Sequence, residues 1–370
     1  MDRNRRLVIA GAILALWGSM GQAGAQDAMT SPLVLKDGGS FFVGGKLQQT
    51  DAVSGNPQGP GGFGYSNTDI ITVDQMYVQF QVPVKSADSI PIVMIHGCCL
   101  SAKSWEETPD GWMGWYEYFV RRHHAVYLPD QSSRARSGFD ATAVNEVALG
   151  LKPVGTLPRL FTFGRNSAWD LFRFGPRYPE VWPDQQFPME ALEEFSKQVI
   201  PDANPTLPDP NPTFANLART AVLAGGAVVI GHSESGFFPE QAMLADASGV
   251  RGMVSIEGRC PVLSDAQVAV LSKAPVLFIF GDHIDGSDVS KALWTKNVSD
   301  CNRVTAQINA AGGKAELWEL PKLGLHGNSH MLMMDRNNLR IADMILEWIA
   351  KNVDQNHSPA LIGRHRNDPD

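Results

Sequence analysis

The sequence lacks an excess of positive charge. Its 370 residues include 31 lysines and arginines against 39 aspartates and glutamates, a net charge of -8. Nucleic acids and anionic lipid surfaces are bound mainly through clustered positive charge, so we expect no nucleic-acid partner. With 44% hydrophobic and 19% charged residues, the composition is that of a globular protein and excludes a disordered or collagen-like chain.

The sequence also lacks an apolar run of the ~20 residues that a membrane-spanning helix needs. One shorter run, residues 7–17, follows three arginines within residues 3–6 and precedes Ala23-Gly24-Ala25. This order of a basic stretch, an apolar stretch and small residues is typical of a cleavable signal peptide. We therefore expect residues 1–25 to be removed, which predicts a secreted or periplasmic protein without a membrane anchor.

Cysteine is scarce, and no CxxC spacing typical of a metal site occurs. The adjacent His123 and His124 lie where a strand is expected to begin, so their rings would point to opposite faces. We expect no metal and no cofactor.

An even number of cysteines in an oxidising compartment favours disulfides. We expect Cys260 to pair with Cys301, closing a loop that contributes about 4 kcal/mol in the chain-entropy model. Adjacent Cys98 and Cys99 could form only a strained disulfide, because neighbouring Cα atoms lie closer than disulfides usually allow. Two buried thiols are the alternative, and the sequence leaves both open.

Short apolar runs alternate with helical patterns along most of the chain, which predicts an α/β fold with a mostly parallel central sheet flanked by helices. Residues 26–82 instead predict antiparallel edge strands, with clear alternation over residues 70–82. The last helix is predicted around residues 341–349. Buried strands are expected at residues 90–95, 125–128, 227–230, 252–256, 276–280 and 315–320. Ligands bind at the carboxyl ends of such strands.

Residues 140–215, the cap segment, interrupt this alternation and are rich in proline and aromatic residues. We interpret them as a cap inserted into one domain of residues 26–353, because long insertions in compact domains are usually functional. The cap aromatics could bind an apolar or aromatic part of a substrate or simply pack the cap. Residues 354–370 predict a loose tail.

The run Gly231-His232-Ser233-Glu234-Ser235-Gly236 follows a predicted strand and precedes a predicted helix. A serine in this position is typical of the nucleophile elbow of the α/β-hydrolase fold. Ser235 stands where the usual pattern has glycine, with Gly236 directly after it. Ser233 is therefore the candidate nucleophile.

A serine nucleophile needs a histidine base, which in turn needs an acid, and in this fold their order is Ser, acid, His. His330 follows the last predicted strand and is the candidate base, while the nearby His326 could line the rim. Glu257 and Asp285 both follow predicted strands, and the residues alone do not decide which is the acid.

Two backbone N–H groups are expected to stabilise the oxyanion that forms during catalysis. One belongs to Glu234, directly after the nucleophile. The other should come from the loop His96-Gly97-Cys98-Cys99, and we assign it to Cys98.

These motifs resemble a group of secreted α/β-hydrolase esterases, mainly bacterial, which carry a Cys-Cys pair in the oxyanion loop and use glutamate as the catalytic acid. The resemblance covers roughly residues 70–350. It implies Ser233 as nucleophile, Glu257 as acid, His330 as base, and Cys98 with Glu234 as oxyanion donors. The shared motifs are His96-Gly97-Cys98-Cys99, Trp105-Glu106, Pro109-Asp110-Gly111, Asp130-Gln131-Ser132, Arg136-Ser137, Gly231-His232-Ser233, Ile256-Glu257-Gly258 and Gly327-Asn328-Ser329-His330-Met331.

The sequence thus predicts a secreted serine esterase that hydrolyses small-molecule or polymeric carboxylic esters through an acyl-enzyme. The same residues would serve an acyltransferase, and a non-catalytic binding protein on this scaffold is a third hypothesis. The choice between a monomer and a homodimer stays open.

Overall fold

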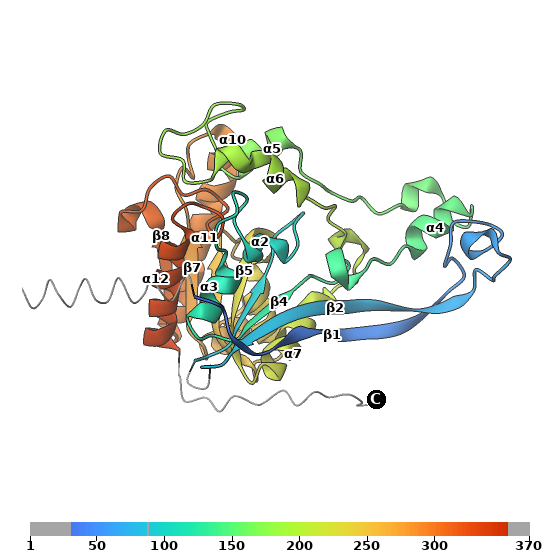
Figure 1. Ribbon diagram of the computed structural model, residues 1–370, viewed down its shortest axis with the longest axis horizontal. Helices are drawn as coiled ribbons and strands as arrows, with labels where there is room; N and C mark the ends of the chain where they lie inside the picture. The colour runs from blue at the N-terminus through green and yellow to red at the C-terminus, as the bar shows by residue number, and fades with distance from the viewer. Residues whose placement is uncertain (1–30, 87–88, 354–370) are drawn as a thin grey trace, which may run out of the picture.

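The computed structural model describes residues 31–86 and 89–353, so the predicted signal peptide and the predicted tail lie outside the described residues. One sheet of eight strands runs through the molecule in the order β1-β2-β4-β3-β5-β6-β7-β8 (Figure 1). Its strands are β1 (Leu35–Thr50), β2 (Asp69–Pro83), β3 (Ile92–Ile95), β4 (Val126–Pro129), β5 (Ala227–His232), β6 (Val250–Ile256), β7 (Val276–Phe280) and β8 (Ala315–Glu319).

The helices cover both faces of this sheet. They are α2 (Lys103–Glu106), α3 (Trp115–Arg121), α4 (Thr142–Ala148), α5 (Arg165–Leu171), α6 (Leu192–Lys197), α7 (Pro212–Leu223), α8 (Phe238–Ala245), α9 (Asp265–Leu271), α10 (Asp288–Ser290), α11 (Lys296–Ala310) and α12 (Asn338–Asn352). Helices α3 and α12 contribute to one hydrophobic core, and α7, α8, α9 and α11 contribute to the other. The predicted fold class is confirmed.

The central strands explain why two cores form. From β3 to β8 all strands are parallel, and successive side chains point to opposite faces. In β5, for example, Val228 and Ile230 belong to one core while Ala227 and Val229 belong to the other. Because both faces are buried, these strands are continuously apolar in the sequence, as the prediction assumed.

The edge strand β1 is much longer than the sequence suggested, whereas β2 matches the predicted strand at residues 70–82 to within one residue at each end. β1 pairs with β2 along nearly its whole length, from Leu35 opposite Pro83 to Thr50 opposite Asp69. The hairpin extends far beyond the body of the molecule, and α4 lies at its tip (Figure 1). There Asn145 Nδ2 donates hydrogen bonds to the carbonyl oxygens of Ala52 and Val53 at 2.9 and 3.0 Å.

Within the cap segment, α5 and α6 lie near α10 over one end of the central strands, whereas α4 lies at the tip of the hairpin (Figure 1). Helix α7, which begins at Pro212 within the last residues assigned to the cap, packs in the core with β5. Among the described residues, none of the helices combines the length and apolar character needed to cross a membrane.

The predicted disulfide between Cys260 and Cys301 is confirmed, and it joins the loop after β6 to α11. Cys98 and Cys99 are thiols in the structure, with their Sγ atoms 2.7 Å apart.

Candidate active site

Ser233 follows β5 directly, in a turn so tight that several residues packed around it must be glycine. Its backbone has φ 58°, a left-handed conformation that is strained for a non-glycine residue. A Cβ atom on Gly231 would lie 2.0 Å from the Ser235 carbonyl oxygen, and one on Gly97 would lie 2.8 Å from Ser233 Cβ. The sequence pattern of the nucleophile elbow therefore corresponds to a real steric requirement.

Ser235, which replaces the usual glycine, is accommodated because its hydroxyl is used. Its Oγ accepts a hydrogen bond from the His232 N–H at 3.0 Å and lies 3.0 Å from the Ile95 carbonyl oxygen, which can accept its proton. The position that must lack a side chain is Gly236, because a Cβ atom there would lie 2.3 Å from Gly258 Cα. The small-residue requirement of the elbow is thus met one position later than the usual pattern has it.

Ser233, His330 and Glu257 form a continuous chain of hydrogen bonds. His330 Nε2 lies 2.8 Å from Ser233 Oγ, and His330 Nδ1 lies 3.1 Å from Glu257 Oε2. The side chains of His330 and Glu257 are both buried. Since Nδ1 faces a carboxylate, it carries the proton, and Nε2 can accept one from Ser233.

Glu257 is a fully buried carboxylate that is held in its ionised form. It follows β6 with φ 55°, and the Gly281 N–H donates to its Oε1 atom. Burial alone raises the pKa of this carboxyl group, but the Arg173 charge and the hydrogen bonds from His330 and Arg173 outweigh it and lower the pKa to about 2.

The other two residues considered for the triad lie elsewhere. Asp285 is exposed to solvent beyond the loop that follows β7. His326 has a side chain that is 62% exposed, and its Nδ1 atom lies 3.4 Å from Asp282 Oδ2. The structure therefore brings Glu257, and not Asp285, to His330.

Arg173, from the cap segment, is the residue of this site that the sequence did not reveal. Its Nη1 and Nη2 atoms donate to the two carboxylate oxygens of Glu257 at 2.9 and 2.6 Å. Its Nε donates to the Asp282 carbonyl oxygen at 2.6 Å, and the guanidinium lies over the Trp294 ring. No motif marks an arginine that comes from a distant part of the sequence, so only the fold could identify it.

The loop that carries His330 is anchored on both sides. His232 Nε2 donates to the His330 carbonyl oxygen at 2.9 Å, and burial with the nearby His330 ring lowers the pKa of His232 to about 3, which keeps it neutral. Asp335 accepts hydrogen bonds from the Ser329 N–H and the Asn328 side chain, both at 2.9 Å. These contacts limit movement of the imidazole relative to Ser233.

The cap segment contacts the two predicted oxyanion regions. The Ile200 N–H donates to the carbonyl oxygen of Cys99, next to Cys98, at 2.9 Å, and Asn204 Nδ2 donates to Glu234 Oε1 at 2.8 Å. These contacts tie the cap to both the loop of Cys98 and the side chain of Glu234.

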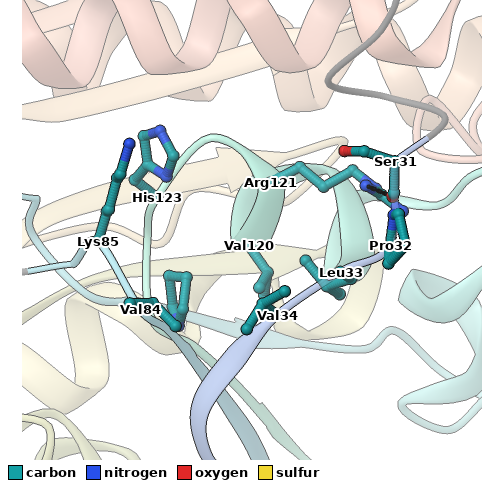
Figure 2. A pocket seen from close by; sticks show the side chains of 10 residues that line it. Ser31, Pro32, Leu33, Val34, Val84, Lys85, Val120, Arg121 and His123 are labelled. Carbon is teal, nitrogen blue, oxygen red and sulfur yellow. Dashed lines mark hydrogen bonds between the residues drawn. The ribbon is translucent and has the colours of Figure 1, made fainter.

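A separate surface pocket of about 310 Å³ lies away from these residues (Figure 2). Lys85 precedes β3 and His123 precedes β4, so the pocket is at the amino ends of the strands, whereas Ser233, Glu257 and His330 follow carboxyl ends. The pocket is lined in part by Pro32, Leu33, Val34, Val84, Lys85 and His123.

Comparison with known proteins places the chain in a class. No protein-family model matches it. A bacterial esterase of known structure is 45% identical, with a TM-score of 0.81 over 87% of this chain and 98% of that protein. A fungal protein described as the probable secreted lipase phiG, from Fungal sp. (strain ATCC 74256), is 26% identical over 318 residues, 75% of this chain and 86% of that protein.

The fold and the arrangement after β5, β6 and β8 are those of an α/β-hydrolase of the esterase and lipase class. At 45% identity over nearly the whole of the bacterial esterase, this chain belongs to the same α/β-hydrolase esterase family.

Proposed function

We propose that the protein is an exported serine esterase that hydrolyses carboxylic esters through an acyl-enzyme. The observation that carries the proposal is the buried chain of hydrogen bonds from Ser233 Oγ through His330 to Glu257. The disulfide between Cys260 and Cys301 and the resemblance to a secreted lipase support export to an oxidising compartment.

The reaction has two halves. His330 Nε2 takes the Ser233 proton as Oγ attacks the ester carbonyl, and the N–H groups of Cys98 and Glu234 stabilise the oxyanion. When the carbon–oxygen bond breaks, the alkoxide leaves with the proton from His330, and Ser233 is acylated. Water then loses a proton to His330 as it attacks the acyl group, and the bond to Ser233 Oγ breaks while His330 returns that proton to Oγ, which releases the carboxylic acid and restores Ser233. Glu257 stays ionised and stabilises the imidazolium.

Labelling with a fluorophosphonate, followed by peptide mass mapping, tests the proposal. The expected result is one adduct on the peptide that contains Ser233, lost in Ser233→Ala. Ser235→Gly is the matched control and should still be labelled, because Ser235 lies on the same peptide but points away into its own hydrogen bonds. No adduct on the folded wild-type protein would contradict the proposal and favour a non-catalytic binding protein.

The pKa of His330 sets the acid side of the pH profile. Burial lowers the pKa of His330 below its usual value, Glu257 opposes this shift, and the Arg173 charge adds to it. A general base works only when unprotonated, so a lowered pKa should preserve activity as the pH falls to the usual histidine value of about 6.5. We expect kcat/KM to decline only below that pH. A decline that starts clearly above it would contradict this environment for His330.

Half of the cap aromatics, including Trp169, Phe174 and Phe187, are buried, which supports the interpretation that these side chains pack the cap. Phe161 differs, because its side chain is 49% exposed and its carbonyl oxygen lies 3.7 Å from Cys99 Sγ. We propose that Phe161 contacts the substrate beside the oxyanion loop.

Phe161→Ala should therefore raise KM for aromatic esters roughly 10-fold while leaving KM for acetate esters of small alcohols nearly unchanged, since only a large apolar group would lose the contact. Tyr178→Ala is the control, because Tyr178 is a cap aromatic of similar exposure that packs on Trp169. Equal changes in the two variants, measured by steady-state kinetics, would contradict a specific role for Phe161.

A further inference from the structure

Three side chains of metal-ligating type converge outside the candidate active site. Asp184 comes from the cap segment, and Asp282 and His283 follow β7. One ligand atom from each residue lies within 4.8 Å of the others. Asp184 is about 100 residues from the adjacent Asp282 and His283, so no spacing motif indicates the group.

The closest pair is joined by a hydrogen bond, with His283 Nε2 2.9 Å from Asp184 Oδ1. Zinc–nitrogen and zinc–oxygen bonds are about 2.0–2.2 Å long, so one ion could contact both atoms after a small adjustment of the two side chains. The ion would then replace this hydrogen bond.

The imidazole of His283 is held in position. The Trp182 ring stacks on it with a centroid separation of 4.4 Å and an angle of 11° between the planes. The backbone of His283 has φ 55°, and its N–H donates to Asp282 Oδ1 at 2.7 Å. Such orientation of a ligand by its neighbours is typical of metal sites in proteins.

A second imidazole lies at the edge of the group. His326 Nδ1 is 3.4 Å from Asp282 Oδ2, and the exposure of this side chain leaves room for it to rotate toward an ion. The same Asp282 oxygen accepts a hydrogen bond from the Gly327 N–H at 2.9 Å. This cluster therefore contacts the loop that carries His330 as well as the cap.

We propose that Asp184, Asp282 and His283 bind one divalent transition-metal ion, with His326 or water completing its coordination. A set of imidazole nitrogen and carboxylate oxygens suits zinc. The ion would join the cap segment to the loop after β7 and would act structurally, because the triad does not include these residues. The inference is independent of the esterase reaction proposed above.

Titration of the EDTA-treated protein with zinc chloride, by calorimetry and by thermal unfolding, tests this site. We expect one zinc ion per chain and a rise in the unfolding midpoint of about 5 °C at a 100-fold excess over Kd. Asp184→Asn and His283→Gln should each abolish the rise. The Asp184 side chain is 43% exposed, so its replacement is tolerable, and each variant is compared with its own metal-free midpoint.

Two controls separate this site from other zinc ligands. His123→Gln removes an exposed histidine at the other end of the sheet, and Cys98→Ser alters a second group of ligand type formed by Cys98, Asp202 and Glu234. Both variants should keep the zinc response. The proposal is overturned if the wild type binds no stoichiometric zinc, if both Asp184→Asn and His283→Gln keep the response, or if a control variant alone abolishes it.

Discussion

Ser233→Ala should lower kcat for a p-nitrophenyl ester by a factor on the order of 10⁵, because the variant cannot form the acyl-enzyme and keeps only the oxyanion donors and substrate binding. The hydroxyl that is lost lies 2.8 Å from His330 Nε2, so the base no longer has a nucleophile to deprotonate. Steady-state hydrolysis, measured with enough enzyme to detect the residual rate of the variant, would give the ratio of the wild-type kcat to the variant kcat.

The fold of this variant should be unchanged. Ser233 has a strained backbone with φ 58°, and alanine occupies that conformation no less easily than serine. The unfolding midpoint should therefore match that of the wild type. Retention of more than a few per cent of the wild-type kcat by a correctly folded variant would rule Ser233 out as the nucleophile.

Arg173→Met should lower kcat on the order of 100-fold. General acid–base catalysis contributes roughly 10²–10⁴-fold, and a misplaced Glu257 should cost an amount at the lower end of that range. Arg173 is a positioning residue, since it contacts Glu257 and not the reacting atoms. Its removal leaves Glu257 as a buried carboxylate without its cationic partner, which also destabilises the fold by about 3–5 kcal/mol. Kinetics at low temperature, where the variant stays folded, separate the two effects.

The pH profile distinguishes positioning from a purely structural role. The Arg173 charge lowers the pKa of both His330 and Glu257. Without it the pKa of His330 should rise, so the acid limb of kcat/KM should move to higher pH. Arg173→Lys keeps the charge but not the paired hydrogen bonds, and it should retain the position of the limb while losing part of kcat. An unchanged limb in Arg173→Met would contradict the proposed electrostatic role.

Much of this architecture is local and could therefore be predicted. A strand buried on both faces must be apolar throughout, which is why β3, β5 and β7 were recognisable as short runs. The elbow at Ser233 depends on small residues that are neighbours in the chain, and so does the loop around Gly97. The length of β1 could not be predicted, because side chains along it such as Phe42 and Leu47 face solvent and leave no clear apolar pattern, whereas the alternation over residues 70–82 predicts β2.

The sequence by itself predicted the fold class, Ser233 and His330 as candidate nucleophile and base, and the pairing of Cys260 with Cys301. From the residues alone, however, Glu257 and Asp285 were equal candidates for the contact with His330. Only the tertiary structure placed Glu257 against His330 Nδ1, brought Arg173 from the cap onto its carboxylate, and gathered Asp184 with Asp282 and His283. The reason is physical: these contacts join segments far apart in the chain, and their distances depend on how the cap packs on the sheet.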